Sequence, residues 1–70
     1  MTLTRRQTTV LEYIRDHIAV NGYSPSVRDV GAWLGVSIHA AEQHLIALEK
    51  KGAIQRKARV ARSIRIVAIP

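Results

Sequence analysis

The stretch SIHAAEQHLIALEKKG, residues 37–52, decides the fold of this chain. Ser37 can cap the first free amide groups of a helix, and Gly52 can close its end in a left-handed conformation. Between them, apolar residues recur at spacings of four and three and form one stripe: Ala41, Leu45 and Leu48. The segment therefore predicts a helix with one buried face and one polar face that is free to bind a partner.

Two more helices are predicted upstream from their starting signals. Thr4 with Gln7, and Ser26 with Asp29, have the form of a capping box, in which two side chains bond each other's backbone amide groups. Apolar residues follow each box at helical spacing. The three predicted helices cover residues 5–21, 27–34 and 38–51.

Only about three residues separate the second predicted helix from the third. Gly35 ends the one, and Ser37 starts the other. Helices joined so closely cross at a steep angle, which is the spacing of a helix-turn-helix. An ordinary helical hairpin in a small bundle shares these local features, so the local pattern leaves both structures open.

After Gly52 the sequence takes on the character of strands. Ser63–Val67 alternates with β-branched residues at period two, so we expect two strands at about 53–57 and 63–68. The intervening KARVAR has no glycine or proline, which favours a loop of several residues over a tight turn. The predicted fold is mainly α with a small β-hairpin: a single winged helix-turn-helix domain over residues 1–70, with three helices and a two-stranded antiparallel wing.

The charge of the chain is strongly asymmetric. The net charge is +6, and all five acidic residues precede position 50. Seven basic residues lie between Lys50 and Arg65 with no acid among them. This distribution favours a polyanionic partner such as nucleic acid over a basic surface that is merely solvated.

Several classes of protein are disfavoured by composition. There is no cysteine, and the three histidines lack the partners that a zinc site needs. No apolar run reaches the roughly 20 residues of a membrane span. Neither paired carboxylates, a nucleophile with a base, nor a glycine-rich phosphate loop is present. We therefore expect no metal, no cofactor, no catalytic residue and no enzymatic activity, and we expect a cytoplasmic protein without membrane contact.

Six segments, in order and spacing, carry a family resemblance: LTRRQ (3–7), YIRDHI (13–18), GYSPSVRDVG (22–31), LGVS (34–37), AAEQHLIALEKKGAI (40–54) and RSIRIV (62–67). Together they cover nearly the whole chain, which resembles the N-terminal DNA-binding domain of LexA-type SOS repressors. The resemblance implies that the third helix enters the major groove of operator DNA, while the wing lies along the backbone.

The resemblance also implies roles for individual residues. The base-reading positions of the family match Ser37, His39, Ala40, Glu42 and Gln43. The positions that approach DNA phosphates match Arg6, Ser26, Arg28, Arg59 and Arg62, and we expect Lys57 of the basic hairpin to join them. The chemistry is suitable, because Gln43 can pair with adenine, Glu42 can accept from the cytosine amino group, and His39 can donate to guanine.

The chain departs from the family at three points. Its turn between Gly35 and Ala40 is one residue shorter than expected, and Ile46 occupies an outward position where a polar residue is usual. The sequence also stops at Pro70, where a LexA-type repressor continues into a dimerising, self-cleaving domain. We therefore expect an operator-binding domain without that half.

The sequence leads to two functional hypotheses. The first is sequence-specific binding of double-stranded DNA and transcriptional repression, with a homodimer on a palindromic operator. The alternative is a winged-helix interaction module that binds a host regulator or RNA polymerase through Glu42, Ile46 and Glu49. RNA binding is disfavoured because few aromatic residues are available to stack on unpaired bases.

Overall fold

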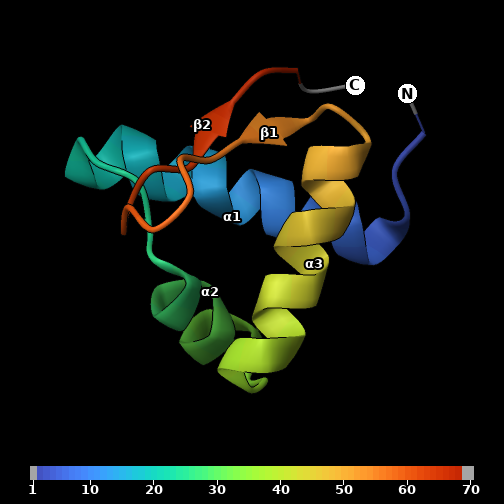
Figure 1. The fold of residues 1–70 in the computed structure, drawn as a ribbon, viewed down its shortest axis with the longest axis horizontal. Coiled ribbons are helices and arrows are strands. Elements are labelled where there is room, and N and C mark those ends of the chain that lie inside the picture. The colour runs from blue at the N-terminus through green and yellow to red at the C-terminus, as the bar shows by residue number, and fades with distance from the viewer. Residues whose placement is uncertain (1, 69–70) are drawn as a thin grey trace.

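The computed structural model describes residues 2–68 and contains three helices followed by a two-stranded antiparallel sheet. Helix α1 spans Arg5–Asn21, α2 spans Val27–Leu34 and α3 spans Ile38–Lys50. Strands β1 (Ile54–Gln55) and β2 (Arg65–Ile66) form the wing (Figure 1). The predicted winged helix-turn-helix fold is confirmed.

Each helix begins at a side chain that satisfies its free amide groups. Thr4 and Gln7 close a complete capping box at α1, and Ser26 and Asp29 close another at α2. At α3 the Ser37 hydroxyl accepts a hydrogen bond of 3.1 Å from the Ala40 amide. These local bonds fix the starts of the helices, because each supplies a partner that the helix itself cannot.

The turn between α2 and α3 brings two backbones unusually close. A Cβ atom on Gly31 would lie 3.1 Å from the carbonyl oxygen of Val36 and 3.4 Å from that of Ser37. The backbone of α2 can therefore approach the start of α3 only because residue 31 has no side chain. This contact holds the two helices of the motif at their crossing.

The hydrophobic core lies where the three helices meet the wing. Its members share an exposed fraction of 6% or less: Val10, Leu11, Ile14, Val30, Ala41, Leu45, Leu48, Ala53, Ile54 and Ile64. The predicted stripe of α3 is therefore buried in full. Ile54 and Ile64 cover the open side of the helical layer, so the wing completes the core in addition to any binding role.

The wing is less regular than the sequence predicted. Strands were expected over 53–57 and 63–68, whereas the ladder pairs only Ile54 with Ile66 and Gln55 with Arg65. Instead of further ladder bonds, Ser63 closes the loop: its hydroxyl accepts from the Lys57 amide at 3.0 Å and donates to the Lys57 carbonyl at 3.2 Å. After residue 55, the hydrogen bonds of the Ser63 hydroxyl to the Lys57 backbone thus take the place of strand pairing.

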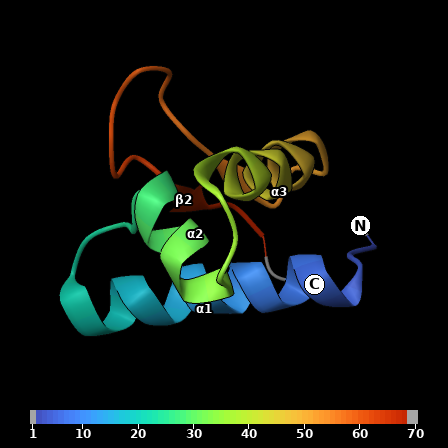
Figure 2. The ribbon, with the colours of Figure 1, turned by 90° about the horizontal axis from the view of Figure 1, so that it is seen from below.

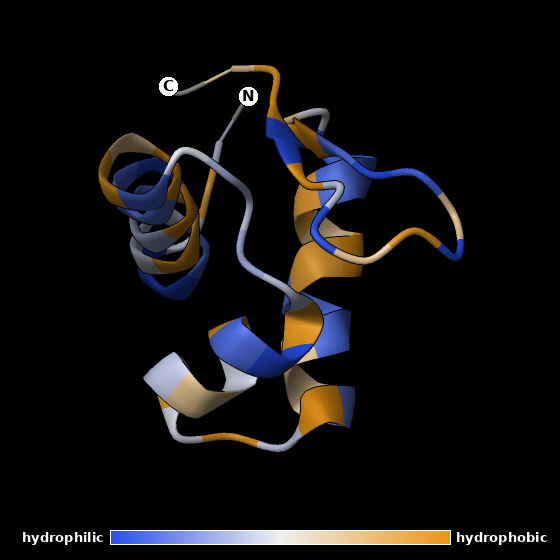
Figure 3. Cartoon of the chain, turned by 90° about the vertical axis from the view of Figure 1, so that its left-hand side faces the viewer, coloured by the Kyte–Doolittle hydropathy of each residue, from blue (hydrophilic) through white to orange (hydrophobic). Residues whose placement is uncertain are grey.

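α3 and the wing project on the same side of the molecule. Figure 2 shows α1 as the base, with α3 and the loop of residues 56–64 rising from it in one direction. In Figure 3 this loop extends farther from α1 than α3 does. The outer face of α3 and the tip of the wing can therefore contact one partner together.

No helix within the described residues is long and apolar enough to cross a membrane.

Candidate nucleic-acid interface

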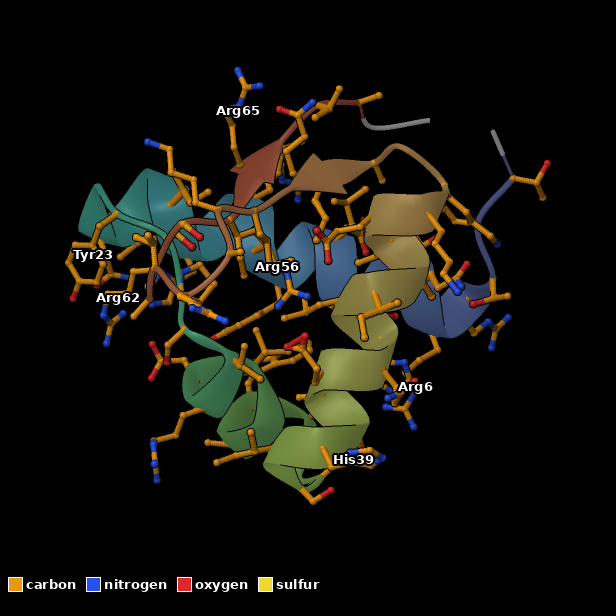
Figure 4. The ribbon with its side chains drawn as sticks, viewed as in Figure 1. Arg6, Tyr23, His39, Arg56, Arg62 and Arg65 are labelled. Carbon is orange, nitrogen blue, oxygen red and sulfur yellow. The ribbon has the colours of Figure 1, made fainter. Side chains whose placement is uncertain are left out.

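The predicted base-reading residues occupy the first two turns of α3, but they do not form one set. His39 and Gln43 are four residues apart and exposed, so they lie on one face of the helix (Figure 4 labels His39). Ser37 is exposed too, although its hydroxyl is engaged as the helix cap. Ala40 is half-buried. The exposed strip of His39 and Gln43 presents donors and acceptors to solvent.

Glu42 instead faces the wing and is held by Arg56. Its two carboxylate oxygens accept from the two terminal guanidinium nitrogens of Arg56 at 2.8 and 2.7 Å. Arg56 also donates from Nε and Nη2 to Glu49 Oε1, at 3.0 and 2.7 Å. The hydrogen bonds between Arg56 and Glu42 lower the pKa of Glu42 and raise that of Arg56, so this pair is charged at neutral pH.

The start of α2 carries two residues of the predicted interface. Ser26 is half-buried in the capping box, and Arg28 is exposed on the first turn. The Ser26 amide donates to Asp29 Oδ2 at 3.1 Å, and this bond is the main reason that the pKa of Asp29 lies below its ordinary value, followed by the attraction of Arg62. An ionised Asp29 therefore holds both the helix start and the wing.

Arg62 connects the wing to the helices by three contacts. Its Nη1 donates to Asp29 Oδ2 at 2.8 Å and to the Ser24 carbonyl at 3.2 Å. Its guanidinium carbon lies 5.0 Å from the centre of the Tyr23 ring, which is a cation–π distance, and Figure 4 shows the two side chains next to each other. Arg62 therefore anchors the wing, while 44% of its side chain is still exposed.

A cleft of about 660 Å³ lies between the wing, the start of α2 and the outer face of α3. Its charged lining residues are Arg28, Glu42, Glu49, Arg56, Lys57, Arg59 and Arg62. Arg56 offsets one of the two carboxylate charges, and the lining holds five cations against two acids, so the net charge of the cleft is positive. Within residues 2–68, the side chains of Arg28, Lys57 and Arg59 have no ion-pair partner.

Arg6 stands apart from these residues. In the view of Figure 4 it lies to the right of α3, whereas α2 and the wing lie to the left. Nearby, Lys51 Nζ donates to Gln7 Oε1 at 2.6 Å and to the Thr2 carbonyl at 2.8 Å, which ties the end of α3 to the start of α1. The predicted cations thus flank α3 on two sides.

Aromatic side chains form a row on another part of the surface. Trp33 stacks on Tyr13 with ring centres 4.5 Å apart, and His17 contacts both Tyr13 and Tyr23 edge to face. Trp33 and Tyr23 are each about half exposed. This row packs α2 and the connector onto α1. Among the described residues, no group of three or more potential ligands is arranged to hold a metal ion.

The pairing of Arg56 is the feature of this surface that the sequence analysis does not predict. Arg56 was counted only among the basic residues of the hairpin, although it is bonded to two acids of α3. One signal was available: Glu42 and Glu49 are seven residues apart, so they share a helix face. Two carboxylates on one face attract a cation from elsewhere in the chain, and Arg56 is the one that pairs with them.

A family model described as the LexA DNA binding domain matches residues 1–63. The LexA repressor of Thermosipho africanus is 46% identical over 68 residues, which are 97% of this chain and 34% of that protein. The LexA repressors of Teredinibacter turnerae and Thermotoga maritima are 49% and 48% identical, each over 91% of this chain and 32% of theirs. The chain spans about a third of the length of these curated relatives.

Proposed function

The chain belongs to the family of LexA DNA-binding domains, and from that membership we propose that it binds double-stranded DNA in a sequence-specific way. The observation that carries this proposal is the common direction of α3 and the basic wing loop, with unpaired cations in the cleft between them. A helix enters the major groove while flanking cations meet the phosphates on either side.

Base reading is assigned to the first two turns of α3. His39 and Gln43 are exposed and carry the donors and acceptors that distinguish base pairs in the major groove. Ser37 and Ala40 lie at the same end of the helix, where contact with the groove floor is closest. Glu42 completes the set as an acceptor for a cytosine amino group.

Phosphate contacts are assigned to the residues around this helix. Arg28, Lys57 and Arg59 line the cleft and are exposed. Ser26 lies beside Arg28 at the start of α2, and Arg62 retains exposed surface at the base of the loop. Arg6 would meet the backbone on the other flank of α3. Such contacts add affinity without sequence preference and weaken as salt rises.

We further propose that the domain acts as the operator-binding part of a transcriptional repressor of the SOS type, in the cytoplasm and without catalysis. The named relatives are repressors, which supports this role. One helix reads only a few base pairs, so specificity calls for two copies on a palindromic operator.

Selection from a random duplex library, followed by gel shifts on the selected duplex, tests the proposal. We expect a palindrome, and affinity that falls steeply between about 50 and 200 mM salt. Arg59→Ala should reduce the slope of log affinity against log salt by about one. Arg15→Ala, which removes an exposed cation paired with Asp16 on α1, is the matched control and should leave the slope unchanged.

A protein-interaction module remains the second candidate function. The observation in its favour is Ile38, which is 47% exposed on the cleft side of α3 and could pack against an apolar partner. The pairing of Glu42 and Glu49 with Arg56 weighs against this function, because these two acids are among its expected contacts. If no duplex is enriched in the selection, this function replaces DNA binding.

A further inference from the structure

Arg56 differs from Lys57 and Arg59 of the wing because its guanidinium group is bonded to carboxylates within the molecule. Only 15% of its side chain is exposed, and its three guanidinium nitrogens make four hydrogen bonds to two carboxylates. Arg59 and Lys57, by contrast, are exposed. Arg56 is therefore not available as a phosphate contact. Any influence of Arg56 on DNA binding must therefore act through Glu42 and Glu49, the residues to which it is bonded.

The bidentate bond fixes the carboxylate of Glu42 in one place. A free glutamate on a helix surface samples several rotamers, and ordering it on binding would cost entropy. With both oxygens bonded to the planar guanidinium, the carboxylate has a defined position and orientation. Each oxygen keeps a second lone pair, so the held carboxylate can still accept from another donor.

Arg56 also decides the charge that α3 presents to DNA. Glu42 and Glu49 are both about one third exposed, and unpaired carboxylates there would repel the phosphates. The guanidinium offsets one of the two charges and spreads over both groups. The carboxylate nearest the first turn can then enter a polyanionic groove at a reduced electrostatic cost.

We propose that Arg56 is a specificity-determining positioning residue, which holds Glu42 on the side of α3 that faces the cleft, so that the domain prefers cytosine at one position of each half-site. This inference rests on the proposed DNA binding. Arg56 touches no base itself; it sets the place and the charge of the side chain that does.

The test compares base preferences selected from a random duplex library. The unaltered domain should prefer cytosine at one half-site position, and Arg56→Met and Glu42→Gln should each reduce that preference by about tenfold. The double variant Arg56→Met, Glu42→Gln should lose no more cytosine preference than either single variant, because both substitutions remove the same Arg56–Glu42 interaction. It should also bind more tightly than Arg56→Met alone, since the unpaired Glu42 charge is gone.

Two further variants separate positioning from folding and from charge. Arg56→Lys keeps the cation but cannot form the bidentate bond, so it should fold and bind with a relaxed cytosine preference. Glu49→Gln is the matched control, because it removes a carboxylate from Arg56 without touching the two bonds to Glu42, and it should keep the preference. Thermal melts of each variant establish that it is folded.

The outcomes distinguish this inference from the function on which it rests. If Arg56→Lys and Arg56→Met select the same sequence as the unaltered domain and merely bind all duplexes more weakly, the positioning role is wrong while DNA binding stands. If the unaltered domain selects no sequence, both fail together. Loss of preference at the same position in the Arg56 and Glu42 variants supports the proposal.

Discussion

Arg62 and Arg56 show how two cations of a basic protein are used for structure. Arg62 holds Asp29, the Ser24 carbonyl and the Tyr23 ring, and Arg56 holds two acids of α3. Neither role follows from counting charges. How much of the charge of a basic residue is available to phosphates depends on its partners within the molecule, which here lie 33 and 14 positions away in the chain.

Replacement of Arg62 should loosen the wing. We expect Arg62→Met to lower the free energy of unfolding by about 0.5–1 kcal/mol, because a partly exposed ion pair and a cation–π contact are lost. Amide exchange should also accelerate at Ile64, whose amide donates to the Ser24 hydroxyl at 3.1 Å. Arg15→Met breaks an exposed ion pair and should change stability by less than about 0.5 kcal/mol. Equal effects of the two changes would contradict the anchoring role.

Asp29 and Glu42 should make stability fall in acid. Their pKa values in the folded protein lie below the ordinary values of 3.8 and 4.5, mainly through the Ser26 amide and the Arg56 guanidinium respectively. A lowered folded pKa stabilises the protein above the ordinary value, and this contribution disappears as the pH falls through the folded pKa.

Urea unfolding over a series of pH values measures this effect. The midpoint of the unaltered domain should be nearly constant between about pH 7 and 5.5 and should drop below about pH 4.5. The double variant Asp29→Asn, Glu42→Gln should be less stable at pH 7 and should show a smaller drop in acid. Parallel curves for the two proteins would show that neither carboxylate contributes.

At the scale of elements, the sequence was most informative where the determinants are local. The caps at Thr4, Ser26 and Ser37 involve residues three positions apart, and the structure contains all three. The wing was less predictable because its shape depends on distant partners. Arg59 and Arg62 adopt positive φ angles of 62° and 54°, which no local pattern of KARVAR indicates.

In the candidate interface, too, the features that depend on local sequence were predictable and those that depend on distant partners were not. The exposed positions of His39 and Gln43 follow from helical periodicity, which sequence supplies. The engagement of Glu42 by Arg56 does not, because it depends on how the wing folds back over α3. The sequence thus indicated which elements form the interface and left open which of its charges are paired.

The close approach of α2 and α3 should make residue 31 intolerant of a side chain. On helix propensity alone, Gly31→Ala would stabilise α2 by about 1 kcal/mol. We expect destabilisation by about 1 kcal/mol instead, because the methyl group would crowd the carbonyl oxygens of Val36 and Ser37. Chemical denaturation measures the change. The exposed neighbour Ala32 is the control, since Ala32→Gly should lose stability by propensity alone. If Gly31→Ala is instead more stable than the unaltered domain, the turn can shift to make room for the methyl group.

At the scale of the whole molecule, a single reading helix limits what one copy can recognise. The domain measures 25 × 24 × 23 Å, so one copy spans about 0.7 of a helical turn of duplex on one face. We therefore expect that specific binding uses a second copy in the next accessible groove.

Sedimentation with DNA measures this stoichiometry. With the palindrome obtained by selection we expect two copies per duplex, and with a duplex that contains one half-site we expect one. Joining two copies by a flexible linker should raise affinity for the palindrome by about 10²–10⁴-fold and leave the half-site affinity nearly unchanged. One copy on the palindrome at saturation would contradict dimeric use.

The shared carboxylate of Asp29 limits how far this wing can be treated as a separable module. The same oxygen accepts from the Ser26 amide and from Arg62, and Ser24 holds the returning arm of the loop at Ile64. Residues 56–64 transplanted onto another three-helix domain would not keep this loop conformation, because Asp29 and Ser24 would be missing. A transferable wing would have to include the Tyr23–Asp29 segment, so the portable unit is a discontinuous pair of segments that lie more than 25 residues apart in the chain.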